Sequence, residues 1–407
     1  MTDPANRDGA PSASAALPPL EGVRVVEFGV ILSGPFCGML LADLGADVIK
    51  VENPDGGDPM RAWPPMSNGF SENFLSINRS KRSVVLDLKS SSGLAAARAL
   101  ALSADALVEN FRPGVMDKLG LGYAALSAAK PDLVYCSISA FGQTGPRAGE
   151  GGFDLTIQAF SGVMSVTGEP DGAPTKCGVP LSDCAAGCYA ALAMVSALLG
   201  VRAGKPGRHI DVPMLGASLG FAALQTSEYF GTGRLPQALG SAHPRNAPYE
   251  AFKAKDTHFA LAAGNDSLWN EVCGAMRRPD LAADPRFATI RDRAANQTAL
   301  KAILEADFAR HDAAHWLMLF RQHGVPCAPI NSYADVLSDT QVEHMGWVQP
   351  VTLPSGVETR TFLSPLRFNG QRAAGFRAPP ALGEHTEEVL AELDARIGGH
   401  KRHSRHH

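Results

Sequence analysis

Several patterns that would identify a function directly are missing from this sequence of 407 residues. It does not contain the G-x-x-x-x-G-K-[ST] loop that binds nucleotide phosphates. Its seven cysteines are an odd number and widely scattered, which argues against a disulfide framework. None forms a C-x-x-C pair, and the segment HDAAH (311–315) lacks the glutamate of a zinc-binding H-E-x-x-H helix. We therefore expect no metal site.

Basic charge and long apolar runs are also scarce. The formal net charge is −4, and without the basic residues of the segment 399–407 it is nearer −7, so no nucleic-acid partner is expected. The apolar run at 184–201 is shorter than the roughly 20 residues that cross a membrane, which predicts a buried core helix and no membrane partner. The Ala/Ser/Pro-rich start lacks the apolar core of a secretory signal. We expect a cytoplasmic protein with flexible ends.

What is present from residue 23 onward is an alternation of short apolar strands with helical segments. The alternation predicts parallel strands joined by crossover helices, a Rossmann-like α/β arrangement. The first strand-to-helix turn is not a G-x-G-x-x-G loop, because Gly29 and Gly34 are five residues apart. Its free N–H groups could hold a phosphate, or the turn could be purely structural. The expected strands are 23–28, 48–52, 83–88, 106–110, 133–139 and 208–215, and the expected helices include 35–45 and 91–103.

The pattern of predicted strands and helices changes past residue 240. Short strands at 250–255 and 258–263 precede amphipathic helices between 266 and 323, which predicts a smaller α+β domain. A hairpin-like segment at 351–363 and a final helix from about 384 to 397 follow. The residues alone leave open whether this last part packs on the first domain.

Asp183 is the most informative candidate for a catalytic residue. It follows CGVPLS (177–182), which reads as a strand, and it lies at or next to the N-cap of the apolar helix. Aspartate at such a position commonly accepts N–H bonds from the first helical turn. The same N–H groups and the helix dipole favour the ionised form, and an ionised aspartate can attack an activated acyl group. Capping and nucleophilic roles both remain open at this point.

Nine segments, in order and over nearly the whole chain, resemble one family. The sequence is similar to class III CoA-transferases, of the formyl-CoA:oxalate and carnitine CoA-transferase type, a family that also contains α-methylacyl-CoA racemases. The likeness runs from about Leu20 to Leu393. Its segments are PLEGVRVVEF, GPFCGMLLADLGADVIKVENPDGGDPMR, NRSKRSVVLDLKS, VENFRPGVMDKLGLGY, SISAFGQTGP, GGFDLTIQAFSGVMSVTG, GVPLSDCAAGCYAALA, GVPCAPINS and PPALGEHTEEVL.

The resemblance implies an α/β fold with a Rossmann-like large domain and a smaller α+β domain. It implies a ring-shaped chain that is interlocked with a second copy in a homodimer. It also implies that both ends of the chain build the large domain. The expected divisions are a flexible leader (1–18), the N-terminal part of the large CoA-binding domain (19–230), the small domain (231–330), a C-terminal return to the large domain (331–398) and a flexible basic tail (399–407).

The resemblance also implies a reaction that uses CoA and acyl-CoA as substrates, with no metal and no tightly bound cofactor. Asp183 matches the aspartate that forms an acyl anhydride and then an aspartyl-CoA thioester with the substrates. Arg112, Lys118, Lys89 and Arg82 suit a ligand with three phosphates, although each alone could be a solvated charge. The matched CoA contacts are Leu32, Ser33, Leu86 to Lys89, Asn110, Phe111, Arg112 and Lys118.

Two other functions are alternatives to CoA transfer. Racemases of the family carry a histidine directly before the Asp of their G-x-D motif, whereas this chain has Phe153, which accepts no proton, before Asp154. Asp154 is then expected as an active-site neighbour of Asp183. A catalytically silent CoA-binding protein is the second alternative, and the retention of Asp183 argues against it.

The segment AHPRNAPYEAFKAKD (242–256) resembles most closely the branch that moves CoA between succinyl-CoA and small dicarboxylates such as glutarate, hydroxymethylglutarate or itaconate. It lacks the Gly-rich loop of the formyl-CoA:oxalate branch. The hypothesis is that His243 or Arg245, from the partner chain's small domain, contacts the distal carboxylate of the substrate. A solvated loop arginine is the alternative. The partners expected are therefore an acyl-CoA, a small carboxylic acid and a second copy of the chain.

Overall fold

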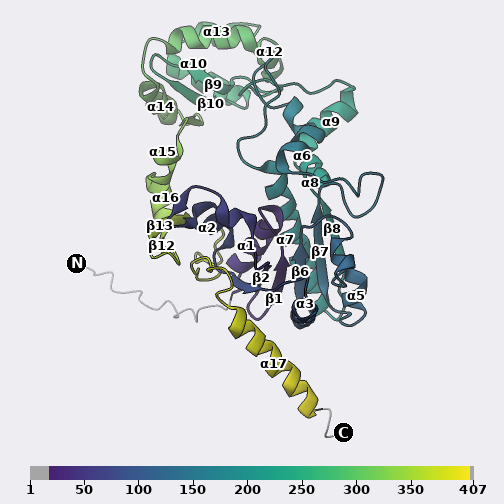
Figure 1. The fold of residues 1–407 in the computed structure, drawn as a ribbon. Helices are drawn as coiled ribbons and strands as arrows, with labels where there is room; N and C mark the ends of the chain where they lie inside the picture. Colours follow the sequence, from purple (N-terminus) through teal and green to yellow (C-terminus); the bar gives the residue numbers. More distant parts are fainter. Residues whose placement is uncertain (1–17, 404–407) are drawn as a thin grey trace, which may run out of the picture. The chain divides into compact units, whose positions relative to one another are not determined.

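The protein is described by a computed structural model that places residues 18–403, with side chains as far as residue 395 (Figure 1). Nearly all of the predicted leader, and residues 404–407 of the predicted tail, lie outside the described residues. The chain forms two compact units. Unit 1 comprises Met1–Ile157, Pro180–Phe221 and Gly346–His407, and unit 2 comprises Gln158–Val179 and Ala222–Met345.

Unit 1 is built on a six-stranded sheet with the order β5-β2-β1-β6-β7-β8, in which every neighbouring pair is parallel. The central strand β1 pairs with β2 on one side and β6 on the other, so the order of the strands reverses between β1 and β6. In such sheets, ligands bind at the carboxyl ends of the strands beside this reversal. The strands are β1 (Arg24–Phe28), β2 (Asp47–Glu52), β5 (Arg82–Val85), β6 (Ala106–Glu109), β7 (Val134–Ser139) and β8 (His209–Pro213).

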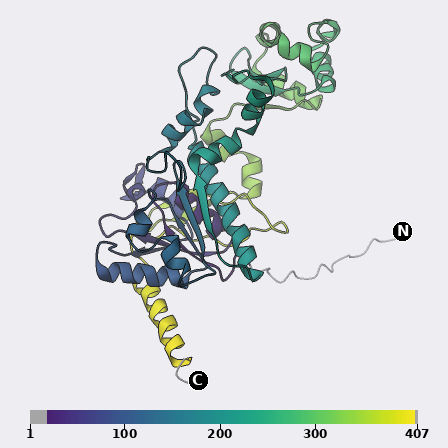
Figure 2. The same cartoon turned by 90° about the vertical axis from the view of Figure 1, so that its right-hand side faces the viewer.

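Helices cover both faces of this sheet, as a doubly wound fold requires. Leu41 of α1 (Ser33–Asp43) and Met194 of α7 (Leu181–Arg202) share one buried cluster with β1, β6 and β7, and Figure 2 shows α7 as a long teal helix beside the strands. The opposite face packs on α3 (Ser91–Ser103), α5 (Tyr123–Ser127) and α17 (Thr386–His403). Alternate residues of each strand serve the two clusters, which explains the nearly continuous apolar runs in the sequence.

The C-terminal helix therefore does pack on the first unit. Val389 and Leu393 of α17 are buried among residues from β1, β2 and α3. Arg82 of β5 ties the same helix down, because its guanidinium pairs with Glu392 at 2.7 Å and with Asp47 at 2.6 Å. Helix α17 continues to His403, so residues 399–403 are helical where we expected a flexible tail; lysine and arginine have high helix propensity.

Smaller elements complete unit 1. A short hairpin precedes α2, and a second hairpin lies against α2 after the chain returns from unit 2. The remaining elements are η1 (Pro59–Ala62), β3 (Met66–Ser67), β4 (Phe70–Ser71), α2 (Glu72–Asn78), α4 (Val115–Lys118), α6 (Asp154–Phe160, which continues into unit 2), α8 (Met214–Phe221), β12 (Val348–Thr352) and β13 (Glu358–Phe362).

Unit 2 has its own sheet, antiparallel and in the order β11-β10-β9, and its own aromatic core. The rings of Phe259 and Phe308 lie 5.1 Å apart and those of Phe308 and Trp316 5.0 Å apart, edge to face. Its elements are η2 (Val163–Ser165), α9 (Ala223–Thr232), β9 (Tyr249–Lys253), β10 (His258–Ala262), α10 (Asp266–Met276), α11 (Pro279–Ala283), α12 (Ile290–Ala295), α13 (Gln297–Phe308), α14 (Ala313–Gln322), β11 (Cys327–Pro329), α15 (Tyr333–Leu337) and α16 (Thr340–Met345).

The unit boundaries differ from the predicted domains in three places, the first being 222–230, which belongs to unit 2 and not to the predicted large domain. Unit 2 includes 158–179, which we placed in the large domain, because the backbone N–H of Gly240 donates to the carbonyl of Gly168 over 2.8 Å. It also includes 331–345, where α15 and α16 pack together before the chain re-enters unit 1. The expected strand at 177–182 is absent, since this segment is irregular up to the start of α7. Its glycine and proline are poor strand formers.

Helix α7 meets the length and composition of a membrane-crossing helix, with a mean hydropathy of 1.9 over its most apolar 18 residues. The core helix of a globular protein meets the same criteria. Ala186, Ala190 and Met194 on one side of α7 are buried against the sheet, so this side is a core face. The other side carries exposed Leu192 and Leu199.

Candidate active site

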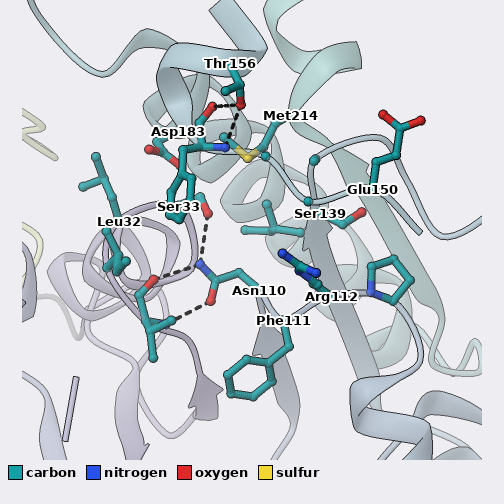
Figure 3. Close-up of a pocket in the computed structure, with 18 residues that line it drawn as sticks. Leu32, Ser33, Asn110, Phe111, Arg112, Ser139, Glu150, Thr156, Asp183 and Met214 are labelled. Carbon is teal, nitrogen blue, oxygen red and sulfur yellow. Dashed lines mark hydrogen bonds between the residues drawn. The ribbon is translucent and has the colours of Figure 1, made fainter. Parts of the chain in front are cut away.

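Asp183 lies in the first turn of α7, where its carboxyl lines a cavity of about 430 Å³. The cavity opens at the carboxyl ends of β1, β6 and β7, beside the reversal of strand order. Figure 3 shows that its polar side chains come from segments far apart in the sequence. They are Ser33, Asn110, Arg112, Ser139, Glu150, Thr156 and Asp183.

The ionisation of Asp183 differs from the sequence-based expectation. Burial and then the nearby negative charge of Asp154 raise the pKa of Asp183 to about 7, while a hydrogen bond from Ser33 opposes them. We expected the helix N-terminus to keep this carboxyl fully ionised at neutral pH. That expectation was wrong, because removal from water and a like charge outweigh the first-turn N–H groups. The carboxyl is poised between its two protonation states near neutral pH.

Asp154, the first residue of α6, takes the capping role that we had considered for Asp183. Its Oδ1 accepts a hydrogen bond from the backbone N–H of Ser182 over 2.9 Å. The residue at the N-cap of α7 itself is Pro180, which makes no side-chain cap bond. Asp154 therefore satisfies a free donor at the start of α7 and leaves the carboxylate of Asp183 available for chemistry.

The turn that follows β1 is held by two side chains from other elements. Asn110, just after β6, accepts from the N–H of Val30 and donates to the carbonyl of Val30, each over 2.9 Å. Asp58 accepts from the N–H of Ile31, whose φ is +65°, an uncommon conformation for a β-branched residue. Asp58 is itself paired with the buried Lys50 at 2.9 Å. These contacts fix where α1 begins and hence where Leu32 and Ser33 lie.

A glycine allows α1 and α7 to approach at this point. A Cβ added to Gly187, one turn after Asp183, would lie 2.8 Å from Cδ1 of Phe36 and 3.0 Å from the carbonyl oxygen of Ser33. Real Cβ atoms do not come this close to other atoms. The close approach brings the start of α1 against the first turn of α7, which places Ser33 beside Asp183.

The predicted residues that follow β6 are gathered around the same cavity. Asn110, Phe111 and Arg112 all line it. The guanidinium of Arg112 lies against the backbone of Gly151, where a Cβ would be 2.8 Å from its Nη2. Arg112 is solvent exposed, so its positive charge is available to an anionic ligand at the cavity.

A second cavity, of about 460 Å³, adjoins the first. Val30 and Phe111 line both cavities, and the second lies at the carboxyl ends of β1, β2 and β5. Leu86 and Lys89 line it, as does Asn53, whose side chain donates to the carbonyl of Gly57 over 2.8 Å. The two predicted binding stretches thus lie in one continuous region of unit 1.

Other predicted residues lie elsewhere. Lys118, at the end of α4, lines neither cavity. Arg82 forms ion pairs with Asp47 of β2 and with Glu392 of α17, so it is not free to hold a phosphate as we had expected. His243 and Arg245 belong to unit 2, where Arg245 pairs with Glu228 at 2.6 Å and burial, followed by the charge of Arg245, lowers the pKa of His243.

Sequence reasoning missed several residues that line the first cavity, among them Ser139, Glu150, Thr156 and Met214. Ser139 ends β7 and Met214 follows β8, so the rule that ligands bind at carboxyl ends of parallel strands could have found both. Glu150 and Thr156 flank the glycines 151 and 152, and no periodic pattern marks them. Among residues 18–403, no group of His, Cys, Asp and Glu is suited to hold a metal ion.

Comparisons with known proteins identify the relatives of this chain. The chain matches CoA-transferase family III over residues 20–386. It is 40% identical to the succinate–glutarate CoA-transferase of Agrobacterium fabrum, covering 97% of this chain and 98% of the relative. It is 38% identical to the succinyl-CoA:glutarate CoA-transferase of Mus musculus (93% of this chain, 87% of the relative) and 42% identical to the acetyl-CoA:oxalate CoA-transferase of Acetobacter aceti (78% and 82%).

A solved structure gives the same result for the fold. The crystal structure of a CaiB/BaiF family protein from Brucella suis superposes with a TM-score of 0.82 at 40% identity, covering 93% of this chain and all of that one. The parallel sheet with helices on both faces is therefore the architecture of that group. The sequence match and the structural match together show that the chain belongs to CoA-transferase family III, enzymes that use CoA thioesters as substrates.

Proposed function

We propose that this enzyme moves CoA from a dicarboxyl-CoA, such as succinyl-CoA, to a free dicarboxylic acid, with Asp183 as the nucleophile. The observation that carries the proposal is the position of Asp183, buried at the start of α7 and facing a cavity at the switch point of the sheet. A carboxylate can carry out an acyl exchange of this kind without a metal, because it forms an anhydride and a thioester in turn.

In the first half of the reaction, one carboxylate oxygen of Asp183 attacks the thioester carbonyl of the donor. The C–S bond breaks, CoA leaves as a thiolate, and an aspartyl–acyl anhydride remains. The thiolate then attacks the aspartyl carbonyl, which releases the donor acid as a carboxylate and leaves an aspartyl-CoA thioester. No proton is gained or lost in these steps.

In the second half, the acceptor carboxylate attacks the aspartyl-CoA thioester and displaces the thiolate, forming a new anhydride. The thiolate then attacks the acceptor's acyl carbon, giving the new acyl-CoA and free Asp183. Donors such as backbone N–H groups at the turn after β1 would stabilise the oxyanions formed at each attack.

We place the CoA moiety across the two adjoining cavities. The second cavity, with Leu86 and Lys89, would hold the adenine-nucleotide part. Phe111, which lines both cavities, would lie beside the pantetheine arm as it passes from one to the other. The thioester then reaches Asp183 in the first cavity. A lysine at the nucleotide end supplies charge that suits phosphate.

The dicarboxylate preference is supported by the names of the relatives. The relatives from Agrobacterium fabrum and Mus musculus are named for glutarate and the one from Acetobacter aceti for oxalate, and each of these acids carries a second carboxylate. Arg112 is a positive charge that lines the reaction cavity of this chain. Arg245 and His243, supplied by a partner chain, remain proposed contacts to the distal carboxylate.

The racemase alternative is disfavoured by the same cavity. Phe153 lines it and is 70% exposed, so it occupies the position where proton exchange would need a base. A phenyl ring accepts no proton, and two-base exchange at an α-carbon needs two acceptors. The silent-protein alternative is disfavoured by the retention of Asp183 at the cavity.

We also propose that the chain works as an interlocked homodimer. Support comes from an unpartnered apolar surface on unit 1, formed by α7 and α8. Monomers rarely expose a contiguous apolar patch of large side chains, so a second copy is the expected cover. The surface comprises Tyr189, Leu192, Leu199, Leu219 and Phe221, which are between 40% and 70% exposed.

The test mixes isotopically labelled succinate or glutarate with a panel of acyl-CoAs and follows label into CoA esters by mass spectrometry. Wild-type protein is expected to exchange label, and Asp183→Asn to lose the exchange while remaining folded. Asp171→Asn, an exposed aspartate in unit 2, is the matched control. Full exchange by Asp183→Asn would refute the mechanism. Deuterium incorporation at the α-carbon of 2-methylacyl-CoA in heavy water would favour the racemase.

A further inference from the structure

One wall of the second cavity is a loop that has little rigidity of its own. The loop, residues 53–58, connects β2 to η1, and most of its residues line the cavity. Gly56 and Gly57 both adopt a positive φ, of +83° and +72°, which glycine reaches without the steric cost that other residues meet. Because two adjacent glycines permit many other conformations, contacts from outside must fix the shape of the loop.

The carboxylate of Glu52, the last residue of β2, is the centre of these contacts. Its Oε2 accepts from the backbone N–H of Asp58 over 2.9 Å, which joins the end of the loop to the strand. Arg61 donates to both carboxylate oxygens, from Nη2 to Oε1 over 2.7 Å and from Nε to Oε2 over 2.8 Å. Ser83 of β5 donates to Oε1 over 2.6 Å. The side chain of Glu52 is 1% exposed, so water competes little for these bonds.

Arg61 and Ser83 also hold the segment 379–385, which leads into α17. Nη1 of Arg61 donates to the carbonyl of Pro380 over 3.1 Å. Oγ of Ser83 accepts from the backbone N–H of Gly383 over 2.9 Å. Each of the two side chains therefore binds both the carboxylate at the end of β2 and the C-terminal part of the chain.

The segment 379–385 also contacts the loop itself. A Cβ added to Gly57 would lie 2.7 Å from Cδ1 of Leu382 and 2.6 Å from Oε2 of Glu52. Real Cβ atoms do not come this close to other atoms, so only glycine fits at this position. The loop is thus packed between the end of β2 and the C-terminal segment, and all of these residues belong to unit 1.

We propose that Glu52 and Arg61 are positioning residues that hold the loop 53–58 against the segment 379–385, in the shape that receives the nucleotide end of CoA. The inference rests on the proposed binding of CoA across the two cavities. Arg61 lines neither cavity, so it acts through the loop. A ligand that must first order its binding loop binds more weakly, because the ordering costs free energy. The C-terminal part of the chain thereby contributes to CoA affinity.

The charge and shape of the two side chains suit this role. Burial would raise the pKa of Glu52, but the hydrogen bond from Arg61 and the charge of Lys50 outweigh burial and lower that pKa below its ordinary value. Glu52 is therefore an ionised acceptor at neutral pH. Arginine presents its donors in a rigid fork that matches a carboxylate, whereas lysine offers a single charged group. The substitution Arg61→Lys keeps the charge and loses this geometry.

The test compares two acyl donors that differ in their nucleotide. Arg61→Lys is assayed with succinyl-CoA and with succinyl-pantetheine, which lacks the nucleotide, and labelled succinate is the acceptor. The variant is expected to raise KM for succinyl-CoA by roughly threefold to tenfold at an unchanged kcat. Its KM and kcat for succinyl-pantetheine should equal those of the wild type, since that donor does not occupy the second cavity. Ser83→Ala should give a smaller change in the same direction.

A binding measurement makes the result independent of turnover. Adenosine 3′,5′-bisphosphate, which reproduces the adenosine end of CoA, is titrated into each protein by calorimetry. Its Kd should rise in Arg61→Lys by the same factor as KM for succinyl-CoA. Melting temperatures show which variants are folded, and Ser83→Ala replaces Arg61→Lys in both measurements if the latter does not fold.

Arg79→Lys is the matched control. Arg79 makes the same kind of contacts elsewhere in unit 1, since it donates to the two oxygens of Asp43 over 3.2 and 2.5 Å and to the carbonyl of Ser76 over 2.9 Å. It lines neither cavity. Arg79→Lys should lower the melting temperature, as Arg61→Lys does, while the Kd for adenosine bisphosphate and both KM values stay at their wild-type levels.

The positioning role and the proposed function can fail separately. An unchanged Kd for adenosine bisphosphate and an unchanged KM for succinyl-CoA in folded Arg61→Lys overturn the positioning role. Equal losses with succinyl-CoA and succinyl-pantetheine also overturn it, because they indicate a general disturbance of unit 1. In both cases, loss of exchange by Asp183→Asn leaves the proposed function in place. Retained exchange in Asp183→Asn overturns the proposed function, and the Kd for adenosine bisphosphate still decides the positioning role.

Discussion

At the scale of single residues, two carboxyl groups set the pH response of this site. Burial is the main cause that raises the pKa of Asp183 to about 7, and the negative charge of Asp154 is the second cause. The carboxylate of Asp154 also accepts a hydrogen bond from the N–H of Ser182. A protonated carboxyl is a poor nucleophile. The rate of acyl transfer should therefore rise with pH through a midpoint near 7, because a raised pKa keeps the acid form dominant below that pH.

The first prediction concerns Asp154→Asn. The amide keeps an oxygen that can accept from Ser182 but removes the negative charge, so the pKa of Asp183 should fall. The midpoint of the pH–rate profile is expected to move downward by roughly half a unit to one unit, with a several-fold faster rate at pH 6. Asp132→Asn, a surface carboxylate paired with Lys130, is the control. An upward or absent shift would show that Asp154 does not act through its charge.

A second prediction compares the lysines that the resemblance assigned to CoA. Lys89 lines the second cavity and Lys118 lines neither, so the two substitutions should differ. Lys89→Ala is expected to raise KM for acyl-CoA by roughly threefold to tenfold at an unchanged kcat, as expected for a contact made equally in ground and transition states. Lys118→Ala should change KM less than about twofold. Steady-state kinetics with varied acyl-CoA decide this, and equal effects would contradict the assignment of the second cavity to the nucleotide.

At the scale of elements, the packing of α1 on α7 determines the geometry of the site. Two glycines of α7 differ sharply in their surroundings. A Cβ at Gly187 would lie 2.8 Å from Cδ1 of Phe36, whereas one at Gly200 would meet only Cδ of Lys205 at 3.8 Å. The same substitution at the two positions therefore separates helix propensity from close packing.

The third prediction follows from this pair. Gly187→Ala should force α1 away from α7, destabilise the protein by about 1–3 kcal/mol and lower kcat, because Ser33 and Asp183 separate. Gly200→Ala should instead stabilise it by about 0.5–1 kcal/mol through helix propensity and leave kcat unchanged. Chemical denaturation and kinetics measure both. Equal stability of the two variants would show that α1 and α7 can separate at little cost.

Local sequence patterns could predict some elements of the fold but not the contacts between distant ones. The strands of unit 1 and the hairpin near 351–363 were predictable, since buried parallel strands and turns leave local patterns. The ion pair of Arg82 could not be predicted, because its partner Glu392 lies 310 positions further along the chain. A basic residue that binds a phosphate and one that binds a distant helix look alike in sequence.

The candidate site shows the same division between local and long-range information. The family resemblance singled out Asp183, at the start of an apolar helix, and matched Leu32 and Ser33 in the first strand-to-helix turn to CoA contacts. It misjudged the ionisation of Asp183, since the pKa depends on burial and on Asp154, which the fold brings alongside. Glu150 was missed because an irregular loop carries no periodic signal.

At the scale of the whole molecule, the apolar surface on α7 and α8 leads to the fourth prediction. Leu192 is 65% exposed, and in a homodimer it should be covered by the second copy. Leu192→Glu should lower the fraction of dimer in light scattering or sedimentation and reduce exchange activity in parallel, since a buried unpaired charge is costly. Leu192→Ala, which removes area without adding charge, should weaken association less. A wild-type protein that stays monomeric at micromolar concentration would refute the dimer.

The return of the chain to unit 1 has a consequence for synthesis on the ribosome. All six strands of the parallel sheet emerge before residue 214, but the helix that covers part of one face, α17, is the last of the described elements to be translated. Until it emerges, the strand and helix residues that bury Val389 and Leu393 remain open to water while the larger part of unit 2, Ala222–Met345, is being made. At about 5–20 residues per second this interval lasts many seconds. During that time the nascent chain exposes apolar residues on one face of the sheet. A chaperone that binds exposed apolar segments at the ribosome is therefore expected to bind this face.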